Sequence, residues 1–146
     1  MEGYAILLSP LVAGLLAQVA KFVIFSLKHG FDWRFLFEYG HMPSSHTAMM
    51  VSLTSSIGFL EGIQSSEFAI AVVMTLLVIS DALRLRMYIG SYGKTLNNLI
   101  DQLSLDNEPS ISKLKERVGH RPEEIFWGAL LGFAATIILI GIMTMF

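Results

Sequence analysis

Long apolar runs separated by short polar segments are the dominant pattern along the chain. The runs cover residues 4–27, 44–63, 68–83 and 125–146. A helix needs about 20 predominantly apolar residues to cross the hydrocarbon core of a bilayer, so the pattern predicts four transmembrane helices. A further segment, residues 94–105, repeats leucine and isoleucine at helical spacing among polar residues, which predicts an amphipathic helix at the membrane interface.

Composition agrees with this all-α integral membrane bundle of four transmembrane helices and one interfacial amphipathic helix. The 146 residues are 53% hydrophobic and only 15% charged, with a mean hydropathy of +0.60. Such a chain is too apolar for a typical soluble domain. No change of composition divides it, so we expect a single membrane-embedded domain over residues 1–146. The absence of cysteine excludes disulfides and thiolate metal sites.

Small residues predict how two of the helices pack. The second run carries a concentration of hydroxyl side chains, and the last run places small residues at offsets of 0, 4 and 7. Small and hydroxyl residues favour contacts between membrane helices over contacts with lipid, so the second helix is predicted to be central. The smooth face of the last helix suits close packing against another helix. It could also serve a partner subunit, and we predict a homodimer. The residues concerned are Ser52, Thr54, Ser55, Ser56, Gly128, Gly132 and Ala135.

The positive charges are sorted by position along the chain. With four crossings, the ends of the first and third runs and the starts of the second and fourth lie on one side. All ten Lys and Arg residues fall on that side or within about two turns of it. By the positive-inside rule this side is cytoplasmic and both termini are outside. The expected location is a bacterial plasma membrane.

Candidate chemistry begins in residues 40–48, where a polar loop becomes an apolar helix. Pro43 suits the entry to a helix, and either Ser44 or Ser45 can cap it. The small side chains leave backbone N–H groups open to an anion, and His46 follows in the first turn. The alternative for this stretch is an ordinary helix cap.

Cationic side chains approach the same side from two other runs. Lys21 and Lys28 share one face of the first helix, with Lys21 roughly two turns inside its end. A lysine at that depth snorkels, pairs with an acid or lines a polar cavity. Arg84 lies three residues after Asp81 and could form a structural ion pair with it, whereas Arg86 points elsewhere.

This collection of groups suits a phosphate monoester. Helix N-termini and cations stabilise phosphoryl oxygens. Of the two histidines, His46 and His120, one could attack phosphorus while the other protonates the leaving alcohol. Glu124 follows His120 by four residues and could fix its tautomer. The scheme needs no metal or other cofactor, and no nucleic acid partner is expected. His29 and His41 have no partner that the sequence identifies, and we expect neither to be catalytic.

Three motifs in order resemble a known superfamily. They are Met42-Pro43-Ser44-Ser45-His46-Thr47-Ala48, then Asp81-Ala82 with Arg86 and Gly90, then Gly119-His120-x-Pro122-x-Glu124 with Gly128. Together they resemble the divergent branch of the type-2 phosphatidic acid phosphatases, whose superfamily includes the vanadium haloperoxidases.

The resemblance implies a metal-independent phosphatase that passes through a phosphohistidine. It assigns His120 as the nucleophile, Glu124 as the acid that orients it and His46 as the general acid. The positions matching phosphate-binding roles are Ser44, Ser45, Lys21 or Lys28, and Arg86, with Arg84 as either an extra ligand or the partner of Asp81. The chain departs from the main family at Ser45, which replaces a glycine, at Glu124, which replaces an aspartate, and at Leu114, which replaces an arginine.

Two functions of different classes follow. The first is a hydrolase that removes phosphate from a membrane lipid at the cytoplasmic leaflet, with phosphatidic acid, phosphatidylglycerol phosphate or a polyprenyl phosphate as substrate. The alternative is a non-catalytic membrane protein that uses the same anion pocket to bind or translocate phospholipid. A haloperoxidase is disfavoured because it would hold vanadate in a soluble fold.

Overall fold

All the regular elements are helical in the part of the chain that the structure describes. The computed structural model describes residues 2–30, 42–103, 113–114, 116 and 121–145. The helices are α1 (Glu2–His29), α2 (Ser45–Leu60), α3 (Ser66–Ser80), α4 (Arg86–Gln102) and α5 (Pro122–Met145), and a π-helical segment, Asp81–Leu85, joins α3 to α4. The predicted all-α class is confirmed.

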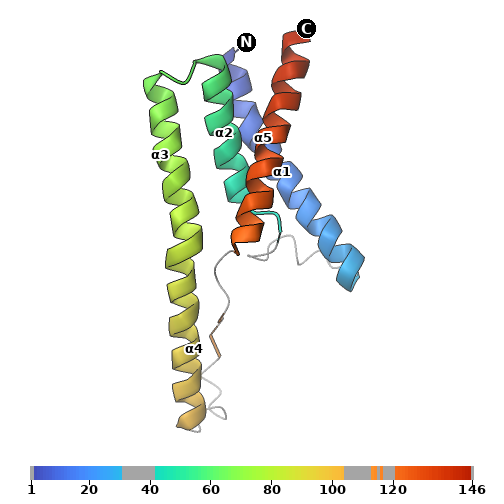
Figure 1. Cartoon of the computed structure of the whole chain (residues 1–146). Coiled ribbons are helices and arrows are strands. Elements are labelled where there is room, and N and C mark those ends of the chain that lie inside the picture. The colour runs from blue at the N-terminus through green and yellow to red at the C-terminus, as the bar shows by residue number, and fades with distance from the viewer. Residues whose placement is uncertain (1, 31–41, 104–112, 115, 117–120, 146) are drawn as a thin grey trace.

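Helix α2 lies at the centre of the bundle and packs against α1, α3 and α5. Both chain termini lie at the end of the bundle where α2 turns into α3 (Figure 1). That turn is rich in polar residues. It contains Gly62 at a φ of +93°, a left-handed conformation that favours glycine, and Ser65 then caps α3 by accepting a hydrogen bond from the Phe68 N–H.

Hydroxyl side chains of α2 join it to two neighbouring helices. The hydroxyls of Ser52 and Thr136 lie 2.7 Å apart and link α2 to α5. Those of Thr54 and Thr75, also 2.7 Å apart, link α2 to α3. Interhelical hydrogen bonds of this kind hold helices together where lipid offers no competing partner. The predicted central position of the hydroxyl-rich helix is therefore confirmed.

Large apolar side chains face outward and small residues fill the interior. Ala13, Ala17 and Ala48 are completely buried, whereas Leu76 and Ile138 are more than 60% exposed. A soluble protein would bury its large apolar residues. The reversed arrangement suits a bundle whose outer surface contacts hydrocarbon, and it agrees with an integral membrane protein.

Two glycines allow α5 to approach α2 closely. A Cβ at Gly128 would collide with the backbone of Ser44, and one at Gly132 would collide with the carbonyl of Ala48. The face predicted to pack against another helix does so, and its partner is α2 of the same chain. A subunit interface would have to use another surface, and the homodimer stays a prediction.

Substituting Gly132 should separate α5 from α2. We expect Gly132→Ala to destabilise the protein by about 1–3 kcal/mol, because the added methyl group overpacks a backbone contact. Gly141→Ala is the matched control on the same helix, since no atom lies within 4 Å of a Cβ there. Thermal unfolding of the two variants in detergent measures the difference. Equal stability would contradict the close packing.

Among the described residues, three helices are long and apolar enough to cross a membrane, and α2 is shorter than predicted. The three are Tyr4–Leu27, the continuous helix Ser66–Gln102 and Pro122–Met145. Helix α2 has 16 residues, about 24 Å at 1.5 Å per residue, against a hydrocarbon core of about 30 Å. The predicted run to residue 63 stops at Leu60 because Glu61 caps the helix and Gly62 turns the chain.

Helices α3 and α4 form one continuous column of 37 residues (Figure 1). The sequence predicted a third span ending at residue 83, with a helix that could run on to Gly90 beyond the hydrocarbon, and an interfacial helix starting at residue 94. The structure instead continues the helix through the interval, which contains no proline to stop it. The amphipathic segment is thus an extension of the third helix, and α4 reaches beyond the other helices (Figure 1).

Candidate functional site

The start of α2 is fastened to both α1 and α5. The Ser44 N–H donates a 2.9 Å hydrogen bond to the Glu124 carbonyl in the first turn of α5. The Ser45 hydroxyl donates to Oε1 of Gln18 on α1, also at 2.9 Å. These contacts bring the N-termini of α2 and α5 together beside the inward face of α1, which is the convergence that the sequence predicted for this side.

The two serines of the predicted phosphate site have different roles in the structure. Ser44 is the N-cap of α2: its hydroxyl accepts hydrogen bonds from the N–H and the hydroxyl of Thr47, and its side chain is completely buried. Ser45 is partly exposed in the first turn, and His46 follows it with an exposed side chain. The question of which serine caps the helix is therefore resolved in favour of Ser44.

Lys21 and Glu124 are a buried pair of opposite charges at this junction. The side chains are 6% and 3% exposed, respectively, and the Glu124 carboxylate attracts the Lys21 ammonium group. Lys21 therefore lies inside the bundle and does not snorkel to the interface. Burying a charge is costly unless an opposite charge or hydrogen bonds compensate it. The Glu124 carboxylate therefore offsets part of the cost of burying the Lys21 ammonium group.

Arg84, another predicted phosphate-binding cation, is related to the site only through the register of the helices. Arg84 is exposed on the π-helical segment, and its predicted pairing with Asp81 stays a prediction. The Thr54–Thr75 hydrogen bond sets the register of antiparallel α2 and α3. Nine residues further toward the site on each helix lie Ser45 and Arg84, so the two are at a similar level along the bundle.

Several predicted site residues lie outside what the structure describes. His120, the predicted nucleophile, is among them, as is the loop that contains His41. Lys28 lies in the last turn of α1 and Arg86 begins α4, but their side chains are not described. The assignment of these residues remains the prediction made from the sequence.

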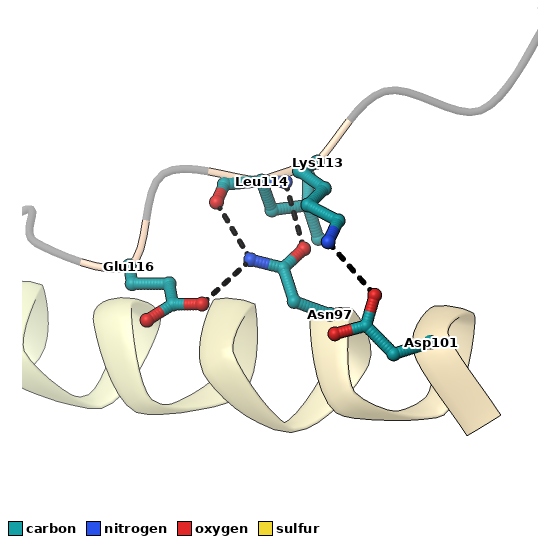
Figure 2. Close-up of polar contacts among 5 residues, drawn as sticks. All are labelled: Asn97, Asp101, Lys113, Leu114 and Glu116. Carbon is teal, nitrogen blue, oxygen red and sulfur yellow. Dashed lines mark hydrogen bonds and ion pairs between the residues drawn. The ribbon is translucent and has the colours of Figure 1, made fainter. Parts of the chain in front are cut away.

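A short strap leading toward His120 is held against α4 by Asn97 (Figure 2). The Asn97 carboxamide donates to the Leu114 carbonyl and accepts from the Leu114 N–H, both at 2.9 Å. It also donates to the Glu116 carboxylate at 3.0 Å, and the Lys113 ammonium lies 2.8 Å from the Asp101 carboxylate. The strap, residues 113–116, ends four residues before His120.

Leu114 thus contributes its backbone to the strap, while its side chain is 46% exposed. By the resemblance stated above, this is the position where the main family has an arginine. Sequence reasoning treated Asn97 only as part of the polar face of a helix and missed its contact. No local signal could have found it, because its partner lies 17 positions away along the chain.

Replacing Asn97 should release the strap. We expect Asn97→Leu to cost about 1–2 kcal/mol of local stability, because the Leu114 backbone loses both of its bonds to the carboxamide. That cost raises the fraction of molecules in which the strap is detached from α4 roughly 5–30-fold. Tryptic cleavage after Lys113 should accelerate by the same factor. The control is Asn98→Leu at the exposed neighbouring position. Cleavage at the wild-type rate would contradict the role of Asn97.

Comparison with known proteins finds relatives over most of the chain. The family described as the divergent PAP2 family matches residues 3–135. The chain is also 32% identical over 145 residues to the uncharacterized membrane protein YuiD of Bacillus subtilis (strain 168), and the match covers 91% of this chain and 92% of YuiD. No solved structure matches this chain significantly.

Proposed function

Because the chain belongs to the divergent PAP2 family, we propose that it is a membrane phosphatase that hydrolyses a lipid phosphate monoester through a phosphohistidine. The observation that carries the proposal is the junction of the α2 and α5 N-termini beside Lys21. Two helix N-termini and a buried lysine create positive potential suited to a phosphoryl group. Glu124 lies at the same junction, four residues after the predicted nucleophile.

The proposed reaction has two steps. In the first, His120 attacks phosphorus, the bond from phosphorus to the lipid oxygen breaks, and His46 donates a proton to the leaving alcohol. In the second, water attacks the phosphohistidine and gives a proton to His46, which restores both histidines and releases orthophosphate. Glu124 holds His120 in the tautomer that attacks.

The first turn of α2 supplies part of the proposed phosphate site. Ser45 is partly exposed there and the turn has backbone N–H groups that point toward the site. Ser44 contributes as the N-cap of α2, which fixes where this first turn begins. The cations proposed to surround the phosphate are Lys21, Lys28, Arg84 and Arg86.

The proposed topology has four crossings, with α2 as a short inner helix. Its 16 residues are surrounded by α1, α3 and α5, so its N-terminus can lie below the membrane surface without facing lipid. The sorting of positive charge supports a cytoplasmic site with both termini outside. In this topology the amphipathic segment of α4 lies on the cytoplasmic side.

A second function is favoured by Leu114. The main family of phosphatases has an arginine at this position, and loss of that charge would weaken stabilisation of the transition state. A protein that binds or translocates phospholipid needs the anion pocket but no such stabilisation.

Phosphate release in the presence of EDTA separates the two functions. The purified protein is incubated in detergent with phosphatidic acid, phosphatidylglycerol phosphate and a polyprenyl phosphate, and free orthophosphate is measured. A phosphatase should act on at least one of these without metal and should be inhibited by vanadate. Binding of a lipid phosphate without any release would favour the non-catalytic function.

A further inference from the structure

An apolar cavity of about 410 Å³, open to the outer surface of the bundle, lies between α1 and α5 next to the candidate site. Ala20 and Ile24 form its α1 side, and Trp127, Leu130 and Ala134 belong to its α5 side. Its volume is within the range of small-molecule sites, about 300–1,000 Å³. Both helices are long and apolar enough to cross the membrane, so the cavity lies at the depth of lipid chains.

The polar junction lies at one end of this cavity. Pro43, which also lines the cavity, directly precedes the cap residue Ser44. Ala20 is followed by the buried Lys21, and Trp127 by Gly128, which packs on Ser44. The same three segments therefore contribute apolar side chains to the cavity and polar or close-packed groups to the junction.

Helix geometry explains how α5 serves both surfaces. Trp127, Leu130 and Ala134 are spaced by three and four residues and share one stripe. Gly128 follows Trp127 and Gly132 follows Leu131, another residue that lines the cavity, each by one residue or about 100° around the helix, and the two glycines face α2. The glycines hold α5 close to α2, and this leaves the neighbouring stripe facing α1 across the cavity.

We propose that this cavity binds one hydrocarbon chain of the lipid whose phosphate occupies the junction; the inference rests on the proposed function and adds to it the subsite for the chain. An apolar chain there stays out of water along its length, while the phosphate at its end meets Lys21 and the α2 N-terminus. The ligand is therefore a lipid that carries a terminal phosphomonoester. Inorganic phosphate alone would leave the cavity without an occupant.

Quenching of Trp127 fluorescence tests the proposal. The chain has two tryptophans, so Trp33→Phe leaves Trp127 as the only reporter, and His120→Ala in addition prevents consumption of the lipid. The protein is placed in phosphatidylcholine vesicles that contain a small, equal fraction of either phosphatidic acid or phosphatidylcholine with brominated chains. Bromine quenches an indole that it contacts. The two lipids carry the same brominated chains and differ only in the headgroup, so a difference in quenching reports the effect of the headgroup.

We expect brominated phosphatidic acid to quench Trp127 at least severalfold more strongly than brominated phosphatidylcholine, in a saturable manner. Ala20→Phe, which fills the cavity, should abolish the excess quenching, whereas Val19→Phe on the exposed face of α1 should preserve it. Equal quenching by both lipids, or excess quenching that survives Ala20→Phe, would overturn the proposal.

The result is separable from the proposed phosphatase activity. Normal phosphate release without excess quenching would reject the chain subsite and leave the hydrolase intact. Excess quenching, together with no phosphate release from the wild-type protein, would support the subsite and reject catalysis. With inorganic phosphate present as competitor, loss of the excess would show that the headgroup directs the chain to the cavity, and an undiminished excess would contradict that link.

Discussion

Replacing His120 by alanine should lower phosphate release from a lipid phosphate by at least about 10³-fold. The expected loss is large because the proposed reaction has no covalent route without the imidazole. Initial rates of orthophosphate release in EDTA, at saturating lipid, measure the effect on kcat. Lipid binding should persist, because Lys21 and the α2 N-terminus are unchanged.

His29→Ala is the matched control for this variant. Both histidines lie on the predicted cytoplasmic side, but His29 belongs to the last turn of α1 and matches no catalytic motif. We expect it to retain activity close to wild type. Activity of His120→Ala within tenfold of wild type would reject the phosphohistidine.

Replacing Lys21 by methionine should destabilise the protein by about 3–5 kcal/mol, because it leaves the buried Glu124 carboxylate without its opposite charge. Methionine keeps most of the length of the side chain, so lost packing contributes little. Thermal unfolding in detergent, compared with wild type, measures the loss. Adding Glu124→Gln to the same protein should recover most of it, because no buried charge then remains.

The double variant also separates stability from catalysis. A protein with both Lys21→Met and Glu124→Gln should be folded but should release little phosphate, because it lacks both a phosphate ligand and the group that orients His120. Glu123→Gln, at the exposed neighbouring position, is the control for the loss of a carboxylate. Full activity of the double variant would reduce the Lys21–Glu124 pair to a structural role.

The sequence alone predicted the packing features that depend on local pattern. The hydroxyl-rich run identified the central helix, and the glycines of α5 identified a close helix contact, since small residues have few other uses in a membrane helix. The convergence of Ser44 and Glu124 was expected from the predicted topology, because successive crossings bring the starts of the second and fourth helices to the same side.

Features that depend on partners far apart in the chain were not predictable. Lys21 and Glu124 lie more than 100 positions apart, so the sequence left snorkelling and pairing open for Lys21. The contact of Asn97 with Leu114 joins a helix to an irregular strap, and no periodicity marks it. The sequence allowed the third helix to run on to Gly90 but missed that it joins the amphipathic segment, because the loss of apolar character after residue 83 marks the edge of a membrane span and not the end of the helix.

Trapping the phosphorylated protein tests the central claim most directly. The purified protein is mixed with a lipid phosphate on which it turns over, quenched in alkali during turnover, digested and examined by mass spectrometry. The account predicts one phosphoryl group on the peptide that contains His120, absent from His120→Ala. Steady release of orthophosphate with the phosphoryl group on another residue, or with none on the protein under conditions that preserve phosphohistidine, would contradict it.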